Sequence, residues 1–391
     1  MSRPSAFIDT LVMRFWERVG RATEVDAESL ACFRVFYCTM LLCFWAPYLG
    51  WINRVPAGFF DPPVLSFAKL FKTFPPAPFF ALLDGMLLVS LVFMAVGFLT
   101  RWFTAAYLIG TIVGQSFEYS FGKIDHSMVG LVILIAMLIA DWGRAGSVDA
   151  LLGRVAASPT ARLGRQRGLA LFAVLLTFGM LTAGLPKVVD WLDFDATTSG
   201  FLRWYYPNRD ALGRTYLLAG LVPRAPLFLL EIGDYSAILL ELCGFVALLS
   251  SARWLRIWLA IATLFHVLND LTLNITFLGQ FLTYTAFVDW RRSAPRGSAL
   301  FDALTRPPAL AGVGTVAGIA ALYHLITRWF GGGTGIVFAP GGKTADVVAL
   351  YVAFPIGVAV LALLVRDALN CAPSPSPSES ASAGVVAVDM H

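Results

Sequence analysis

The sequence predicts an all-α protein, a polytopic transmembrane helical bundle of about 8–10 spans with an N-terminal amphipathic helix at the membrane interface. Hydrophobic residues make up 58% of the 391 residues and charged residues only 14%, whereas soluble domains carry about 25% charged residues. Eleven Trp, eleven Tyr and 31 Phe are typical of the aromatic belts at headgroup depth. The chain has too few charges to cover a surface in water, so we expect it in a membrane.

Residues 1–28 form the predicted amphipathic, cytoplasmic segment. Apolar side chains recur there at helical spacing, at Ile8, Leu11, Val12, Phe15, Trp16 and Val19. Arginines occupy the other side of the same helix, at Arg14, Arg18 and Arg21. Charged residues interrupt any signal-peptide core. Such a helix either lies on the membrane surface or packs against the bundle, and both alternatives stay open.

Apolar runs separated by polar or Pro-rich stretches predict about ten spans. We expect them at residues 30–51, 80–99, 102–118, 126–141, 168–188, 226–250, 253–274, 275–290, 309–329 and 345–366. Prolines make residues 52–79 too broken for a long helix, and residues 190–225 form the longest extramembrane segment between spans. The predicted organisation is an N-terminal segment (1–28), a membrane domain (29–292), additional transmembrane helices (293–370) and a disordered tail (371–391) rich in Ser and Pro.

Arginines concentrate in three loops between the expected spans, at residues 142–167, 251–256 and 291–308. If the N-terminus lies in the cytoplasm, the alternation of spans brings all three loops to the cytoplasm, as the positive-inside rule requires. We therefore expect both termini in the cytoplasm.

Several classes of function are disfavoured by the patterns that the chain lacks. No basic cluster accompanies a soluble fold, so nucleic acid is not an expected partner. The five cysteines form no C-x-x-C pair, and neither H-E-x-x-H nor G-x-S-x-G occurs. No Glu stands three residues before a His, which argues against a di-iron site in the bundle. We therefore expect no metal site.

The stretch Thr182–Trp191 places a lysine at the end of an apolar run. Counted from Gly168 along an upright helix, Lys187 lies roughly 28 Å from the inner surface, at the outer boundary. The same count puts all histidines except the terminal one on the outer side, namely His126, His266 and His324. A lysine at a span end is more often a snorkelling anchor. In a dry pocket, however, a lysine can lose its proton and act as a base.

Other charged residues inside the expected spans are interpreted as structural ion pairs within the bundle. They are Arg34, Asp84, Glu231, Asp234 and Glu241. Arg34, near the inner end of the first span, is expected to neutralise a carboxylate.

Six pieces of the chain, taken in order, form a recognisable set. They are Leu30–Phe36 (LACFRVF), Asp125-His126-Ser127, Gly146–Leu151 (GSVDAL), Ala183–Lys187 (AGLPK) followed by Asp190-Trp191, Glu241 within a span, and Phe265–Asn269 (FHVLN). The set resembles the membrane domain of the vitamin K-dependent gamma-glutamyl carboxylase and its bacterial relatives, the horizontally transferred transmembrane (HTTM) domain proteins. The resemblance covers about residues 30–290.

This resemblance implies a site and a cofactor. Lys187 matches the lysine understood to deprotonate reduced vitamin K, and His126 matches a second acid/base group. His266 and Asn269 match residues that would orient a quinone or oxygen species, and Arg203 would hold a substrate carboxylate. The implied cofactor is a reduced quinone of the vitamin K type, and the implied partners are membrane lipid and a small or peptide substrate. The implied location is the bacterial inner (plasma) membrane, with the site open to the periplasmic side.

The chain also departs from the carboxylases. Two further expected spans and a disordered tail stand where the carboxylases have a large soluble domain for the protein substrate, and Pro186-Lys187 replaces a double lysine. Two hypotheses follow. The first is a quinol-dependent membrane enzyme with a lysine base, carboxylase-like in coupling its reaction to quinol oxidation. The alternative is a non-catalytic membrane maturation, binding or transport protein, in which the polar residues form a structural network.

Overall fold

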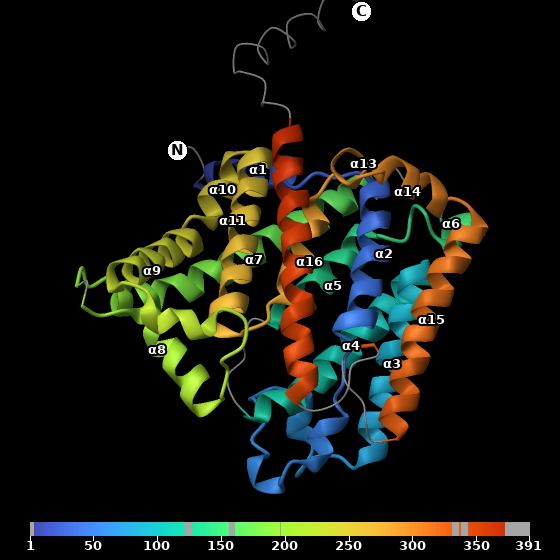
Figure 1. Cartoon of the computed structure of the whole chain (residues 1–391). Helices are drawn as coiled ribbons and strands as arrows, with labels where there is room; N and C mark the ends of the chain where they lie inside the picture. The colour runs from blue at the N-terminus through green and yellow to red at the C-terminus, as the bar shows by residue number, and fades with distance from the viewer. Residues whose placement is uncertain are drawn as a thin grey trace, which may run out of the picture.

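The computed structural model confirms the all-α class. It describes residues 4–121, 127–155, 161–195, 197–330, 336–337 and 343–371, and every regular element in these ranges is helical (Figure 1). The longer helices are α1 (Pro4–Ala22), α2 (Ala27–Phe44), α3 (Ala77–Val96), α4 (Thr100–Glu118), α5 (Met128–Ala140), α7 (Ala161–Trp191), α9 (Leu227–Leu242), α11 (Ala252–Leu273), α15 (Pro307–Trp329) and α16 (Lys343–Asn370).

Shorter helices connect these elements. They are α6 (Val148–Leu151), α8 (Gly200–Tyr206), α10 (Gly244–Ser250), α12 (Leu278–Tyr284), α13 (Trp290–Ser293) and α14 (Gly297–Leu304). Three short 3-10 helices, η1 (Gly50–Arg54), η2 (Ala57–Phe59) and η3 (Phe67–Leu70), occupy the Pro-rich stretch 52–79 and its edge. The expectation that this stretch forms no long helix is therefore confirmed.

Within the described ranges, six helices are long and apolar enough to cross a membrane, namely α2, α3, α7, α11, α15 and α16. The pair α9 and α10, bent by 47°, adds a seventh if it counts as one span. The protein is therefore a multi-pass membrane protein. This count is below the expected ten for three reasons. α4 carries the polar residues Arg101, Gln115 and Glu118, α5 has only 13 residues, and residues 275–290 do not form one helix.

The continuous span expected over residues 275–290 is wrong. α12 is followed by the 3-10 helix η7 (Thr285–Phe287) and then by α13. The segment starts at the end of α11 and returns toward its beginning, where Arg256 Nη2 donates to the carbonyl of Phe287 at 2.7 Å. Residues 281–288 are all buried, and α12 packs against α2, α5 and α16. Irregular backbone at membrane depth is tolerated where protein covers it, and this segment meets that condition.

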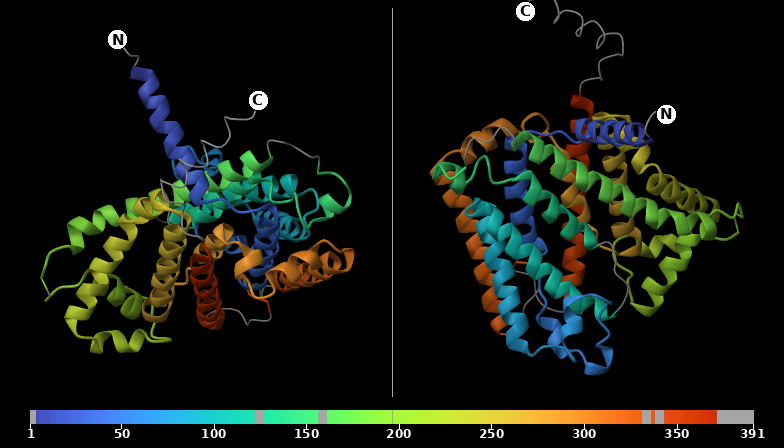
Figure 2. Two further views of the ribbon diagram at one scale, coloured as in Figure 1. Left: turned by 90° about the horizontal axis from the view of Figure 1, so that it is seen from above. Right: turned by 180° about the vertical axis from the view of Figure 1, so that it is seen from behind.

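The arginine-bearing loops gather at one end of the bundle, together with α1 and the last turn of α16 (Figures 1 and 2). Arg162 pairs with Glu24 at 2.5 Å, and Arg291 pairs with Glu28. Arg256 donates to the backbone carbonyl at the end of α1. All three basic loops thus contact the junction between α1 and α2, and we call this the basic end of the bundle.

α1 lies across the bundle axis at the basic end (Figure 2). In its last turns Val19 and Ala22 are buried against the bundle, whereas Ile8, Leu11 and Trp16 are exposed. Apolar side chains exposed on a helix that lies across the end of a bundle suit the membrane interface. Each of the two alternatives for this helix therefore applies to one part of it. The first half extends away from the bundle, as a helix on the membrane surface would, and the last turns pack against the bundle.

Close approach of helices depends on glycine. A Cβ atom at Gly168 of α7 would lie 2.4 Å from the carbonyl oxygen of Ala136 in α5, so a larger residue would force the two backbones apart. Small residues at such crossings are the usual means of helix packing in membranes.

The turn after α5 is held by two buried polar residues. Arg34 takes backbone carbonyls as its hydrogen-bond partners in place of the expected carboxylate, those of Trp142 (2.7 Å), Ala145 (3.2 Å) and Gly146. Asp149 accepts hydrogen bonds at 2.9 Å from the first backbone amides of α4, those of Leu99 and Thr100. The Gly146–Leu151 stretch therefore closes the turn and caps α4.

Candidate functional site

Lys187 and Glu241 form a closed ion pair between α7 and α9. Lys187 Nζ lies 2.5 Å from Glu241 Oε1 and 2.6 Å from Oε2. The Glu241 side chain is 5% exposed and the Lys187 side chain 20% exposed. The sequence singles out both residues but assigns them different roles, one as a base and one as a structural acid. The structure brings them together across 54 positions of sequence.

Gly184, Lys187 and Trp191 lie on one face of α7. A Cβ atom at Gly184 would lie 2.9 Å from the Glu241 Cβ atom, so this glycine lets α9 approach. One turn further on, the Lys187 ammonium lies 5.4 Å from the centroid of the Trp191 ring, within cation–π range. Positions three and four apart share a helix face. One face of α7 therefore carries the glycine that contacts α9, the charged amine of Lys187 and the aromatic ring of Trp191.

Pro186 does not end the helix, since α7 continues through it to Trp191. Asp190, one turn after Pro186, is exposed. The carboxylate that holds Lys187 is therefore Glu241 on another helix and not its neighbour in the sequence.

The pair lies closer to the basic end than an upright helix would place it. α7 and α9 slant away from the bundle (Figures 1 and 2). The indole of Trp258, early in α11, donates to the carbonyl of Leu240 at 2.9 Å. Because Leu240 precedes Glu241, the pair lies near the level of Trp258, roughly 9 Å along α11 from its first residue. The depth of about 28 Å expected for Lys187 is corrected by the slant of α7.

α8 covers the far ends of α7 and α9. Asp234 of α9 accepts hydrogen bonds from the Ser199 hydroxyl at 2.9 Å and from the amides of Gly200 and Phe201 at 2.8 and 2.9 Å. These bonds fix the first turn of α8. Trp191 packs against the same turn, since a Cβ atom at Gly200 would lie 2.3 Å from its ring.

Arg203, the predicted holder of a substrate carboxylate, is on α8 with its side chain exposed. Its charge acts on the acidic loop that follows α7. The Thr198 hydroxyl and the Asp195 amide hold the pKa of Asp193 below its ordinary value, and Arg203 adds to this effect.

His266 and Asn269 lie on α11 and have other neighbours. His266 Nε2 lies 2.8 Å from the Tyr284 hydroxyl, and its ring stacks on Phe277 at 4.5 Å between centroids. Asn269 is buried. The Phe277 and Tyr284 side chains beside His266 belong to the segment that follows α11. Glu241, which pairs with Lys187, is on α9.

Of the other histidines, only His324 lies within the described residues. His126, the second predicted acid/base group, lies outside the described residues. His324 of α15 is buried, with Nε2 at 2.7 Å from the carbonyl oxygen of Leu42.

No known protein family, curated protein or solved structure matches this chain. The site is therefore interpreted from the chain's own residues. Among the described residues, no group of three or more His, Cys, Asp or Glu side chains is arranged to hold a metal ion.

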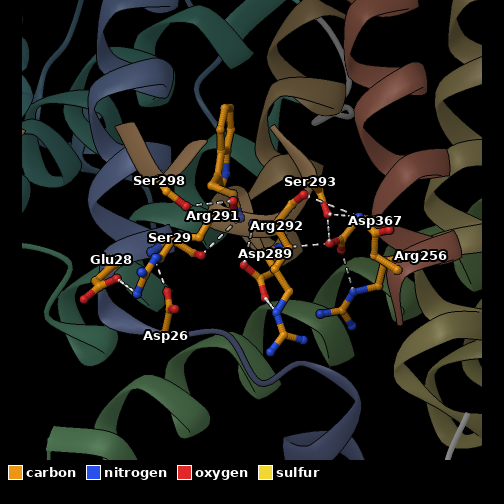
Figure 3. A network of polar contacts seen from close by, with 12 residues as sticks. Asp26, Glu28, Ser29, Arg256, Asp289, Arg291, Arg292, Ser293, Ser298 and Asp367 are labelled. Carbon is orange, nitrogen blue, oxygen red and sulfur yellow. Dashed lines mark hydrogen bonds and ion pairs between the residues drawn. The ribbon is translucent and has the colours of Figure 1, made fainter. Parts of the chain in front are cut away.

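A second buried ion pair, between Arg256 of α11 and Asp367 of α16, was not predicted from the sequence. Both side chains are 3% exposed, and Arg256 Nε lies 3.3 Å from Asp367 Oδ2. Asp367 also accepts hydrogen bonds from the Ser293 hydroxyl at 2.6 Å and the Asp289 amide at 3.2 Å (Figure 3). The one signal in the sequence is an aspartate close to the end of an apolar run. This network ties α11, α13 and α16 together at the basic end.

Proposed function

We propose that the protein is a multi-pass membrane enzyme that draws a proton from a reduced quinone, with the Lys187–Glu241 pair as the proton acceptor. The quinol reaction would drive chemistry on a small or peptide substrate, as the resemblance to the carboxylase membrane domain implies.

The bonding of Glu241 is the observation that supports this proposal. Three other buried acids, Asp84, Asp149 and Asp234, each accept hydrogen bonds from two backbone amides at a turn or helix start. These acids serve the fold. Among the described residues, the Glu241 carboxylate accepts hydrogen bonds only from Lys187. Its partner is therefore a group that can itself give up a proton.

To act as a base, Lys187 needs a neutral amine, and Glu241 is the group beside it that can take the proton. At membrane depth the charged pair has little advantage over the neutral pair, because burial penalises both charges. A proton can therefore pass from Lys187 Nζ to a Glu241 oxygen, which leaves a neutral amine beside a carboxylic acid. When the amine then accepts a substrate proton, the pair carries one positive charge, which balances the anion formed next to it.

An aromatic ring lies beside the amine of the pair, since the Trp191 ring is 5.4 Å from Lys187 Nζ. The outer surface of the same two helices is apolar, with Leu185 and Val189 of α7 and Leu239 of α9 exposed. A reduced quinone bound here would supply a weakly acidic aromatic hydroxyl. Lys187 would orient that hydroxyl, the Trp191 ring would lie against the headgroup, and the apolar tail would lie on the outer surface.

The test combines binding and turnover in the purified protein. Lipid extraction and mass spectrometry should show a co-purifying quinone. In the presence of dioxygen as the electron acceptor, the wild-type protein should oxidise an added short-tailed reduced quinone. Lys187→Arg keeps the charge and the ion pair but cannot supply a neutral amine. We expect this variant to fold and retain quinone while losing at least about 100-fold in turnover. A wild-type protein that neither retains nor oxidises quinone would overturn the proposal.

One observation favours the non-catalytic alternative, a membrane binding or maturation protein with a structural polar network. Both oxygens of Glu241 hold the Lys187 ammonium, which is also how an ion pair locks two helices. Under this alternative, Lys187→Arg leaves every measurable function intact. The same variant therefore separates the two candidates.

The orientation that we propose places the basic end in the cytoplasm of a bacterial inner membrane, with both termini on that side. Support comes from the gathering of the arginine-bearing loops at one end (Figure 1), as the positive-inside rule requires. Labelling single introduced cysteines at Gly58 and Arg296 from each side of the membrane tests this orientation. Labelling of Gly58 from the cytoplasm would contradict it.

A further inference from the structure

An apolar groove runs between α11 and α16 and begins at the basic end. It has a volume of about 260 Å³, and among the described residues that line it one arginine is the only charged one. Its walls are formed chiefly by Ile257, Ile261 and Leu264 of α11 and by Leu361 and Leu369 of α16, with Arg253 at one end.

The groove lies on the outside of the bundle, since Ile261 and Leu264 on one wall and Leu369 on the other are exposed. In a bilayer such a groove faces lipid. Water would find almost no hydrogen-bond partner in it, so a hydrocarbon chain is the occupant that fits its lining. The distance from Arg253 to Leu264 is roughly 16 Å along the helix, close to half of the hydrocarbon thickness of about 30 Å. One acyl chain from one leaflet therefore matches the length of the groove.

The charge at the mouth of the groove selects the headgroup. Arg253 is the second residue of α11 and is exposed. None of the ion pairs formed within the described ranges includes it. The neighbouring Trp254 is also exposed, as is typical of aromatic side chains at headgroup depth. A guanidinium binds phosphate through paired hydrogen bonds, and its charge favours a headgroup of net negative charge.

We infer that the groove between α11 and α16 binds an acyl chain of an anionic glycerophospholipid whose phosphate is held by Arg253. This site is distinct from the Lys187–Glu241 pair, which lies on α7 and α9. It does not depend on the quinone chemistry proposed above.

The test is native mass spectrometry of the full chain in detergent, with phosphatidylglycerol and phosphatidylcholine added in equal amounts. We expect one phosphatidylglycerol to be retained in preference to phosphatidylcholine. Arg253→Gln should lower the retention of phosphatidylglycerol about fivefold and leave that of phosphatidylcholine unchanged. Ile261→Trp, which fills the groove, should lower the retention of both lipids.

Arg101→Gln is the matched control, because Arg101 is likewise the exposed second residue of a helix, α4, at the same end. We expect this variant to retain both lipids as the wild type does. Equal retention of the two lipids by the wild type, or equal losses in Arg253→Gln and Arg101→Gln, would overturn the inference. A competition experiment gives a further outcome that would overturn the inference. This outcome is that an added quinone displaces phosphatidylglycerol from the wild type and that the Ile261→Trp variant no longer binds this quinone.

Discussion

Removing the lysine of the Lys187–Glu241 pair should destabilise the protein more than removing both members. Lys187→Met leaves the Glu241 carboxylate, which is 5% exposed, without its partner. Such a loss costs about 3–5 kcal/mol, and the 20% exposure of the lysine side chain favours the lower end. Glu241→Gln costs less, about 1–2 kcal/mol, because the long lysine side chain can turn its ammonium toward the interface.

The double variant should then cost no more than about 2 kcal/mol, which gives a coupling free energy of about 2–3 kcal/mol. Unfolding in mixed micelles of increasing denaturing detergent, followed by tryptophan fluorescence, measures all four proteins of this cycle. The exposed pair of Lys69 and Asp61, 3.6 Å apart with side chains 47% and 92% exposed, is the control, and its coupling should stay below about 1 kcal/mol. Additive effects at Lys187 and Glu241, within about 0.5 kcal/mol, would refute the idea that the pair is closed at membrane depth.

Three further variants test the framework around the site. Arg256→Leu should lower the free energy of unfolding by about 3–5 kcal/mol, because it leaves the buried Asp367 carboxylate without its partner. Adding Asp367→Leu should recover part of that loss, and equal stabilities of the single and double variants would contradict this expectation. Asp149→Ala should cost about 1–2 kcal/mol and speed amide hydrogen exchange in the first turn of α4 alone. Gly184→Leu should cost about 1–3 kcal/mol by forcing α7 and α9 apart, whereas Gly179→Leu on the same helix, where a Cβ atom meets nothing within 4 Å, should be neutral.

Hydropathy predicts most of the long helices because backbone in lipid must satisfy its own hydrogen bonds. The spans expected at 80–99 and 253–274 correspond to Ala77–Val96 and Ala252–Leu273. The arginine pattern also predicts which loops lie at the same end of the bundle, because the arginine content of each short loop indicates the side of the membrane on which that loop lies.

Residues 275–290 show where this approach fails. Their side chains are apolar because they are buried in protein, as the run of buried residues from 281 to 288 shows. Hydropathy measures the avoidance of water and does not separate burial in protein from burial in lipid. Inside the bundle, neighbouring helices cover the backbone, so the segment can break into α12, η7 and α13.

The membrane depth of Lys187 and its ion-pair partner could not be predicted from the sequence, for a different reason. Depth counted by residue assumes an upright helix, whereas tilt is set by packing against neighbours, here between α7 and α9. The sequence did hold one signal, because Gly184 precedes Lys187 by one turn. A small residue there indicates that another helix crosses the same face, so the lysine on that face points toward protein and needs a buried partner. Glu241, a carboxylate inside a neighbouring span, is the residue that meets this need.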